Sequence, residues 1–336
     1  MDKKRNRKEY AMKVNVKPYV GRHCESTATG TLLNQLGIEL SEPMLFGLGE
    51  GLSFIFWNMK TMDFPFIGGR VKPDLLTQNI AKNLGLQLTV KETSSTSKAW
   101  EEVKKLLDEG KAVGLKLDCY HLEYFTHPIH FAGHYVAMLG YDDELAYLVD
   151  TNQQGSEVSS SLKSLERARN EKGPMSSRNL YYILEKKGQM TPLDQAVISA
   201  IRANTKAYLN PPITNLNYKG IEKTSKEIIK WFDSSKDIKT EFSTSAMIME
   251  RAGTGGALFR NLYRDFLQEA YEITGIEAVG EAHKAFVQIA ADWSAVISLF
   301  EKVAQTGERK YVLEASDRLK ELSSSEYEAV SVLASV

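Results

Sequence analysis

The stretch His23-Cys24-Glu25-Ser26-Thr27-Ala28 places a cysteine where a loop gives way to a helix. Apolar residues recur at helical spacing from Ala28 to Leu36 and Gly37 ends the pattern, so we expect Cys24 in or just before the first turn. Unpaired N–H groups and the helix dipole stabilise a thiolate there, and the same N–H groups can hold an oxyanion. The stretch therefore predicts a nucleophilic cysteine.

A cysteine nucleophile needs a base, and the base needs a group that orients it. His134 stands at the start of a predicted strand, 135–139, and Asp150 ends the next predicted strand, 145–149. If these strands are antiparallel neighbours, the two side chains return to the same end of a sheet. We therefore predict that Cys24, His134 and Asp150 form a catalytic set.

Simpler interpretations of these residue types stand beside that prediction. Free cysteines are often buried structural thiols, and the two cysteines of this 336-residue chain do not make a disulfide framework. Cys119 is a competing nucleophile, but the adjacent Asp118 disfavours a thiolate. Four crowded histidines raise the alternative of a metal site, yet they lack a recognisable ligand spacing and no metal is predicted. These histidines are His121, His127, His130 and His134.

The bulk composition excludes several classes of protein. A formal net charge of −1 gives no general attraction to nucleic acid or to a membrane surface. No apolar run approaches the roughly 20 residues that span a bilayer. The N-terminus lacks the apolar core of a signal peptide, so we expect a cytoplasmic protein with free thiols. Residues 1–14 form a basic N-terminal tail that we expect to be solvated.

We expect two domains after the tail. Residues 15–188 carry helical patterns first and strand patterns afterwards, which predicts an α+β domain with an antiparallel sheet. Its first helix is expected to begin near Cys24 and to end at about residue 36, and further helices are expected at 41–47, 74–84, 98–108 and 162–172. Its strands are expected at 86–90, 112–117, 135–139, 145–149 and 179–184. Residues 153–155 and 159–161 are predicted to be loops.

Residues 189–336 are predicted to form an all-α bundle, because nearly every stretch has an amphipathic helical pattern. The predicted helices are 193–208, 225–233, 244–251, 257–274, 278–304 and 309–322. In the first domain, the glycines of residues 47–51 lack the spacing of a dinucleotide-binding fingerprint, and no strand precedes them. No cofactor is therefore predicted.

Further residues near these motifs are candidates for binding substrate. Arg260 and Arg264 stand four residues apart and together fit a phosphate or a carboxylate, with a solvated helix face as the alternative. His23 could act as a cation beside Cys24 or lie on the surface. The predicted substrate-binding residues are His23, Glu25, Glu50, Tyr120, Tyr135, Arg260 and Arg264.

Several motifs occur in a fixed order after the cysteine stretch. They are Glu42-Pro43-Met44-Leu45-Phe46-Gly47-Leu48-Gly49-Glu50-Gly51-Leu52, Gly133-His134-Tyr135-Val136, Gly140-Tyr141-Asp142 and Val149-Asp150. Together with residues 23–28, these motifs resemble the N-terminal domain of the butirosin biosynthesis protein H family. The helical remainder resembles the uncharacterised domain that usually accompanies it, so the resemblance covers most of the chain.

The resemblance implies a papain-like fold related to the C39 cysteine peptidases, with Cys24 as nucleophile, His134 as base and Asp150 as the orienting group. It also implies an acyltransferase that moves an amino acid-derived acyl group from an acyl carrier protein thioester to an aminoglycoside amine. The C39 peptidases place a glutamine before the nucleophile to complete the oxyanion hole, whereas residues 12–23 contain none.

We therefore expect ping-pong acyl transfer in secondary metabolism. The donor would be an acyl carrier protein or another thioester, and the acceptor a small-molecule amine. Two other classes stay open: a cysteine peptidase or amide hydrolase with the same residues, and a non-catalytic binding or assembly protein. We expect neither nucleic acid nor a membrane as a partner, and the sequence leaves a homo-oligomer open.

Overall fold

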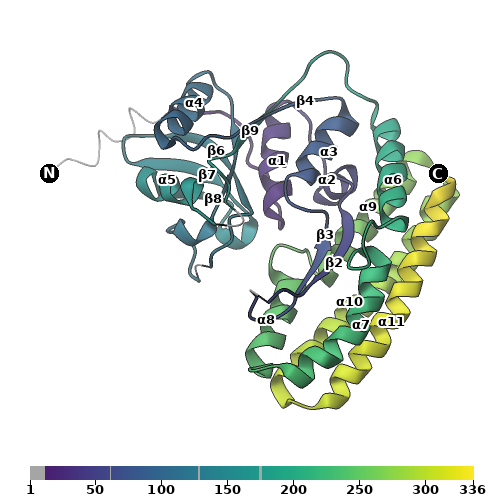
Figure 1. The fold of residues 1–336 in the computed structure, drawn as a ribbon. Coiled ribbons are helices and arrows are strands. Elements are labelled where there is room, and N and C mark those ends of the chain that lie inside the picture. The colour runs from purple at the N-terminus through teal and green to yellow at the C-terminus, as the bar shows by residue number, and fades with distance from the viewer. Residues whose placement is uncertain (1–11, 61, 128, 174–175) are drawn as a thin grey trace. The chain divides into compact units, whose positions relative to one another are not determined.

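The computed structural model describes residues 12–60, 62–127, 129–173 and 176–336. The chain forms two compact units, one of residues up to Glu42 with 85–190 and one of residues 43–84 with 191–336 (Figure 1). Most of the predicted basic tail, up to residue 11, lies outside the described residues. This division differs from the expected one in the segment 43–84, which packs with the C-terminal helices and not with the rest of residues 15–188.

The first unit is built on an antiparallel sheet. Its strand order is β4-β9-β5-β6-β7-β8, and β1 pairs with β6 outside that path. The strands are β1 (Met12–Lys13), β4 (Gln87–Lys91), β5 (Val113–Leu117), β6 (His134–Tyr141), β7 (Leu145–Val149), β8 (Glu157–Ser161) and β9 (Tyr181–Glu185). The predicted α+β class with an antiparallel sheet is confirmed.

Strand β8 contradicts the loop predicted at residues 159–161. Its serine-rich sequence carries little apolar signal, but its backbone pairs with β7 from Leu145 opposite Ser161 to Val149 opposite Glu157. Strand β8 is the last strand of the sheet order and Ser160 is its one buried residue. An edge strand of this kind is selected by backbone pairing, which a search for apolar alternation does not detect.

The register of three strands brings the ends of β6 and β7 together. Leu117 at the end of β5 lies opposite His134, and Ala137 of β6 lies opposite Val149 at the end of β7. The turn between β6 and β7 is held by Asp142, whose Oδ1 accepts hydrogen bonds from two backbone N–H groups at 2.7 and 2.8 Å. The start of β6 and the end of β7 therefore share one edge of the sheet.

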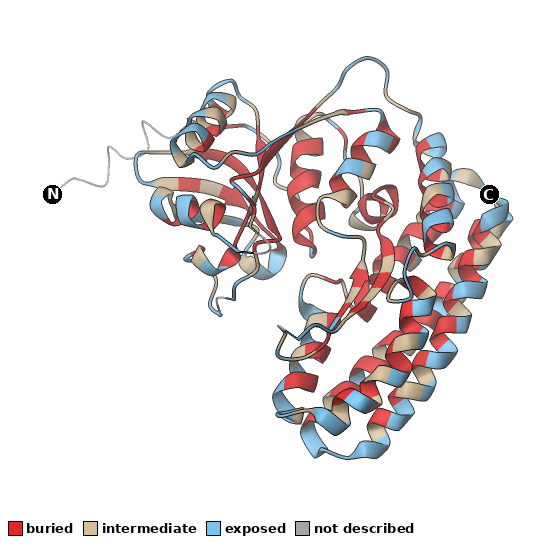
Figure 2. Ribbon diagram, in the orientation of Figure 1, coloured by how far each residue is buried: buried red, intermediate tan, exposed pale blue. Residues whose placement is uncertain are grey.

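Helices cover both faces of this sheet. Helix α1 (Cys24–Gln35) lies on one face, whereas α4 (Thr96–Asp108) and α5 (Leu162–Asn170) lie on the other (Figure 1). Every residue of α1 from Cys24 to Leu33 is buried (Figure 2). Thr27 and Thr31 donate their hydroxyls to the carbonyls of residues four positions earlier, at 2.8 and 2.9 Å, and the hydroxyl of Thr29 pairs with that of Tyr182 at 3.1 Å. Cys24 is the first residue of the helix, as predicted.

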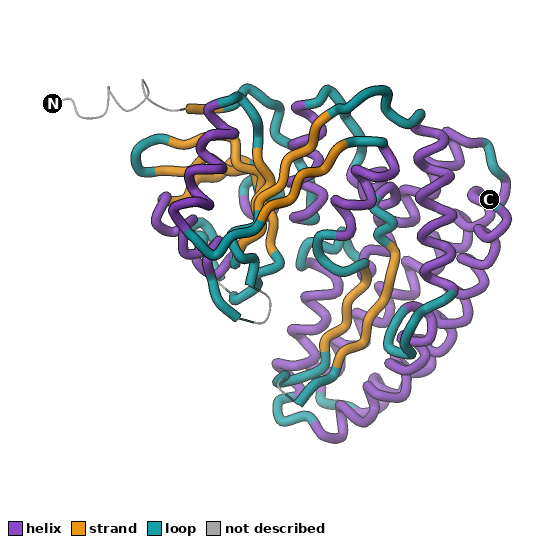
Figure 3. The backbone as a smooth tube through the Cα atoms, turned by 45° about the horizontal axis from the view of Figure 1, so that its top comes forward, coloured by secondary structure: helices purple, strands orange, loops and turns teal. Residues whose placement is uncertain are grey.

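The second unit combines a short hairpin with eight helices among the residues described. The hairpin pairs β2 (Leu52–Trp57) with β3 (Phe66–Arg70) and is seen among the helices in Figure 3. The helices are α2 (Glu42–Leu48), α3 (Leu75–Leu84), α6 (Leu193–Leu209), α7 (Asn217–Ser234), α8 (Ile238–Arg251), α9 (Arg260–Thr274), α10 (Glu277–Thr306) and α11 (Arg309–Val332). None of the described helices is long and apolar enough to cross a membrane.

The hairpin was not predicted, and α9 begins later than the helix predicted at 257–274. The run 52–57 is apolar enough for either a strand or a buried helix, so periodicity alone does not identify it. The helix predicted from residue 257 begins at Arg260, because Ala257, Leu258 and Phe259 have φ values of 50°, 50° and 71°. Those values lie in the left-handed region and interrupt a right-handed helix.

A buried ion pair anchors the second unit. Arg260 and Glu326 are both 0% exposed, and the guanidinium binds the carboxylate in a fork with N–O distances of 2.8 and 2.9 Å. The remaining donor, Nη1, binds the carbonyls of Gly69 and Leu258. Glu326 also accepts hydrogen bonds from Tyr208 and Trp293. Every charge in the cluster is thus compensated, the condition under which a buried pair is tolerated.

Replacement of Glu326 by alanine should destabilise the protein strongly, since it leaves a buried arginine charge without a partner. We expect a loss of about 3–5 kcal/mol in the free energy of unfolding, measured by urea denaturation followed by circular dichroism. Glu314→Ala on the same helix removes an exposed pair with Arg318 and should cost less than about 1 kcal/mol. Equal losses in the two variants would contradict the anchoring role.

Candidate active site

Cys24 occupies the start of a helix that the surrounding side chains cap. His23 is the N-cap residue, and its Nδ1 accepts a hydrogen bond from the Ser26 N–H at 3.4 Å. His23 therefore caps the helix and, at 3% exposed, does not lie on the surface. Cys24 itself is 9% exposed, and its N–H belongs to the first helical turn, where donors lack intrahelical acceptors.

His134 and Asp150 meet at the shared edge of the sheet. Nε2 of His134 lies 2.8 Å from Oδ2 of Asp150, and the two residues are 7% and 0% exposed. The same Oδ2 accepts a hydrogen bond from the Tyr124 hydroxyl at 2.8 Å, while Oδ1 accepts one from the Thr151 N–H at 2.6 Å. Three donors therefore compensate the burial of this carboxylate.

The Cys24 thiol is a hydrogen-bond partner of the His134 imidazole. Because Asp150 engages Nε2, the ring nitrogen left for the thiol is Nδ1. Burial alone would lower the pKa of His134, but the negative charge of Asp150, followed by that of Cys24, raises this pKa well above its ordinary value. The geometry thus favours an imidazolium between a carboxylate and a sulfur.

The charges of His134 and Asp150 also affect the pKa of Cys119. It is 3% exposed, and its Sγ lies 3.4 Å from the carbonyl oxygen of Ile129. Burial raises the pKa of the Cys119 thiol to about 11; the nearby imidazole of His134 opposes that rise only in part, and Asp118 adds to it. Since a thiol of this kind stays protonated at neutral pH, Cys119 is the weaker candidate for a nucleophile.

Two of the crowded histidines form carboxylate pairs of their own. His121 Nε2 lies 2.5 Å from Glu171 Oε2, and His130 Nδ1 lies 3.1 Å from Asp118 Oδ2. Asp118 is buried and also accepts two backbone hydrogen bonds. Within the described ranges no group of three or more histidine, cysteine, aspartate or glutamate residues is arranged to hold a metal ion. The two histidines and Asp118 lie on the segment that leads from β5 into β6, whereas Glu171 directly follows α5.

The predicted substrate-binding residues of the first unit have different surroundings. Glu25 and Tyr135 are 0% and 1% exposed, so their side chains belong to the interior; the ring of Tyr135 packs edge-on against Tyr182. Tyr120 is 43% exposed and stacks on His130 with a centroid distance of 3.9 Å. Of these three residues, Tyr120 alone presents a ring that a substrate could contact.

The other three predicted substrate-binding residues lie in the second unit. Arg260 is committed to Glu326, so it does not form an anion site with Arg264. Arg264 instead binds Asp265 at 2.7 Å and Asn261 at 3.0 Å. Glu50 pairs with Lys82 at 2.7 Å. The prediction of a paired-arginine site is wrong in its geometry, because the spacing in sequence does not reveal which charges already have internal partners.

Sequence reasoning missed the part that Tyr124 and Glu42 play. Tyr124 belongs to the irregular segment between β5 and β6, where no periodicity indicates which side chains point toward the strand ends. Glu42 stands 18 positions after Cys24 at the start of another helix, yet its carboxylate accepts a hydrogen bond from the His23 N–H at 2.8 Å. Neither contact has a sequence signature.

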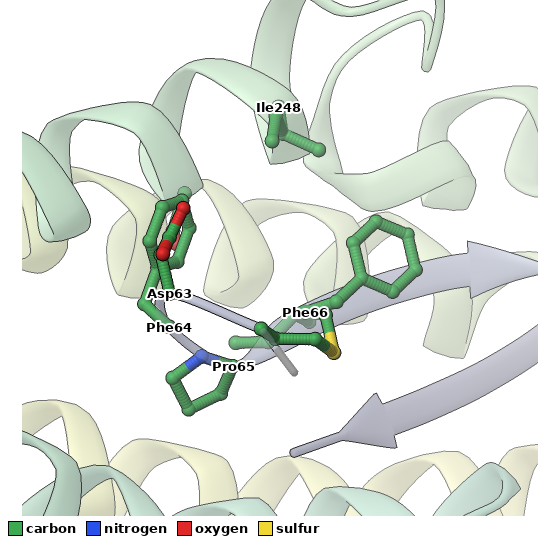
Figure 4. Close-up of a pocket in the computed structure, with 8 residues that line it drawn as sticks. Asp63, Phe64, Pro65, Phe66 and Ile248 are labelled. Carbon is green, nitrogen blue, oxygen red and sulfur yellow. The ribbon is translucent and has the colours of Figure 1, made fainter. Parts of the chain in front are cut away.

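Two surface cavities are present in the second unit. One, of about 280 Å³, lies between the end of the β2–β3 hairpin and α8, and Figure 4 shows Ile248 facing Pro65 and Phe66 across it. The other, of about 160 Å³, lies on the α7 side of the same hairpin. Neither is lined by a predicted site residue. The candidate active site is defined by its hydrogen bonds and charges.

The raised pKa of His134 gives a test by NMR titration. Asp150→Asn removes the carboxylate charge but leaves the burial, so the pKa of His134 should fall, whereas Glu171→Gln, a partner of His121, should leave it unchanged. A raised folded-state pKa stabilises the fold fully below about pH 6.5, and this stabilisation is lost as the pH rises through the folded pKa. An unchanged His134 titration in Asp150→Asn would exclude the charge coupling.

Comparison with known families places this geometry in context. Residues 23–151 match the family described as "Butirosin biosynthesis protein H, N-terminal", a range that contains Cys24, His134 and Asp150. Residues 163–333, about half of the chain, match the family described as "Domain of unknown function (DUF4872)". A search of curated proteins finds no match. The resemblance seen in the sequence is confirmed: the chain belongs to the butirosin biosynthesis protein H-like family, in which this N-terminal domain is followed by DUF4872.

Proposed function

We propose that the protein is a cysteine-dependent acyltransferase of antibiotic-type secondary metabolism, with Cys24 as nucleophile, His134 as base and Asp150 as orienting group. The observation that carries the proposal is the chain of contacts from the Cys24 thiol through the His134 imidazole to the buried Asp150 carboxylate. The proposed nucleophile has a base beside it, and that base has a carboxylate that orients it. The family name, which refers to butirosin biosynthesis, supports the metabolic setting.

A papain-like fold is part of the same proposal. A helix that begins at the cysteine packs on an antiparallel sheet, and histidine and aspartate stand at the ends of adjacent strands. This arrangement supports the fold that the family resemblance implied. The ring nitrogen facing the thiol is Nδ1, while Nε2 faces the carboxylate, so the imidazole bridges the two groups through opposite nitrogens.

The first half-reaction would transfer the acyl group to the enzyme. The Cys24 sulfur attacks the carbonyl carbon of a thioester, and the resulting oxyanion is held by the N–H of the first helical turn. The donor C–S bond then breaks, and the departing thiol takes the proton of the His134 imidazolium. A thioester on Cys24 remains. Exchange of one thioester for another is nearly neutral in free energy, so the donor's reactivity is kept.

The second half-reaction would deliver the acyl group to an amine. The neutral His134 removes a proton from the amine as its nitrogen attacks the Cys24 thioester. The C–S bond breaks, and the thiolate–imidazolium pair is restored. Amide formation from a thioester is downhill and makes the transfer irreversible. The burial of all three residues limits access of water, which would otherwise compete as the acceptor.

The test is to capture the acyl-enzyme. Incubation with an aminoacyl N-acetylcysteamine thioester should add one acyl group to the peptide that contains Cys24, detected by mass spectrometry. The adduct should form in Cys119→Ala but not in Cys24→Ala. Added small amines should discharge it to an amide faster than water discharges it to an acid.

Two results would redirect the assignment. Discharge to the free acid at the same rate with and without amine would indicate a hydrolase that uses the same residues. Absence of any adduct from aminoacyl and simple acyl thioesters, with the protein folded, would overturn the enzyme assignment and favour a binding or assembly protein.

A further inference from the structure

The carboxylate of Glu42 accepts hydrogen bonds from residues on both sides of the cysteine: backbone N–H groups before it and the Ser26 hydroxyl after it. Its Oε1 accepts hydrogen bonds from the His23 N–H at 2.8 Å and the Ser26 hydroxyl at 2.8 Å. The Arg22 N–H lies 2.9 Å from Oε1 and 3.0 Å from Oε2. We infer that Glu42 is a positioning residue for the Cys24 nucleophile, an inference that rests on the proposed function.

The physical reason lies in the conformation of the loop before the helix. Residues 22 and 23 precede α1, so their N–H groups have no acceptor within the helix. Hydrogen bonds to a carboxylate are roughly twice as strong as those between neutral groups. Because one carboxylate holds His23 before Cys24 and Ser26 after it, the backbone at Cys24 is fixed from both sides. The direction of the Cys24 side chain toward His134 follows from that backbone.

The fit of the loop around this carboxylate is close. A Cβ at Gly21 would lie 2.9 Å from Glu42 Oε1 and 2.4 Å from Thr27 Oγ1, so a larger residue would displace the loop. On its other side, the Gly21 carbonyl accepts a hydrogen bond from the Asn152 N–H at 2.9 Å. Asn152 follows Asp150 by two residues. The loop thus links the segment that carries the orienting carboxylate to the start of the nucleophile helix.

The charge of Glu42 argues for orientation rather than activation. A carboxylate near Cys24 would by itself disfavour a thiolate. Its oxygens, however, are occupied by the donors of Arg22, His23 and Ser26, which spread its charge over the loop. The role assigned to Glu42 is therefore to keep the thiol beside the imidazole, and the imidazolium of His134 supplies the stabilising charge.

The pH dependence of Cys24 alkylation tests this role. Iodoacetamide labelling, resolved by site with mass spectrometry, should be fast in the native protein at pH 6, where an ordinary thiol is protonated. Glu42→Gln replaces one acceptor oxygen by a donor and should slow labelling at pH 6 by on the order of tenfold. At pH 10, where a free thiol is ionised without help, the variant and the native protein should label at similar rates.

Two controls define the comparison. Glu39→Gln breaks an exposed pair with Lys17 on the same segment and should label like the native protein at every pH. His134→Ala should show the full loss of labelling at pH 6. A merely loosened structure would instead expose Cys24, which is 9% exposed in the native protein, and raise its labelling at pH 10 above the native rate.

Failure of the inference can be told apart from failure of the proposed function. Slow labelling of native Cys24 at pH 6 would count against the thiolate–imidazolium pair itself. Fast native labelling with an unchanged Glu42→Gln profile would overturn only the role of Glu42. If Glu42→Gln does not fold, Ser26→Ala removes one donor and keeps the carboxylate; it should still slow labelling at pH 6, and an unchanged rate would overturn the inference.

Discussion

The buried carboxylate of Asp150 is the constraint on which the first unit depends. An ionised carboxylate that is 0% exposed is tolerated only when donors replace its lost hydration. The structure supplies them from three places: the start of β6, the segment between β5 and β6, and the backbone just after β7. The hydrogen bonds to this one carboxylate therefore help to fix the strand register and the path of the segment between β5 and β6. The same charge holds the imidazole in a fixed orientation.

Cys24, which we propose as the nucleophile, lies at the start of a helix whose neighbouring groups are also fixed by hydrogen bonds. The N-terminus of α1 offers donors to a sulfur anion, while His23 and Glu42 satisfy the neighbouring donors. Backbone groups thus supply both the electrostatic environment and the rigidity of the site. The buried threonines of α1 pair within the unit and allow this helix to be enclosed although it is not strongly apolar.

The second unit also contains buried charges that compensate one another, and there they stabilise the fold. Arg260 and Glu326 are fully buried and mutually satisfied, and the guanidinium also holds the Leu258 carbonyl within a left-handed turn. Three consecutive residues with positive φ are costly for L-amino acids, so the turn persists only because its surroundings fix it. A charged pair in this setting is part of the core of the unit. For that reason an arginine that looks suited to an anion in the sequence is unavailable for one.

The local features could be predicted from the sequence alone. Apolar periodicity and a terminal glycine predicted α1, and apolar runs predicted the strand that begins near His134 and the strand that ends just before Asp150. These signals are local, because each element's own residues encode them. The helices of the C-terminal half could be predicted from their amphipathic patterns in the same way. What the sequence determined about the site was its three residue types and their places at element ends.

The partners of those residues, in contrast, depend on how the elements pack. Glu42 reaches the loop before Cys24, Tyr124 shares an oxygen of Asp150, and Arg260 turns inward to Glu326. The edge strand β8 and the assignment of residues 43–84 to the second unit also depend on tertiary contacts. Each depends on contacts between residues far apart in the chain. Spacing in sequence carries information about neighbours on one helix or strand, whereas burial and charge compensation are set by how the elements pack.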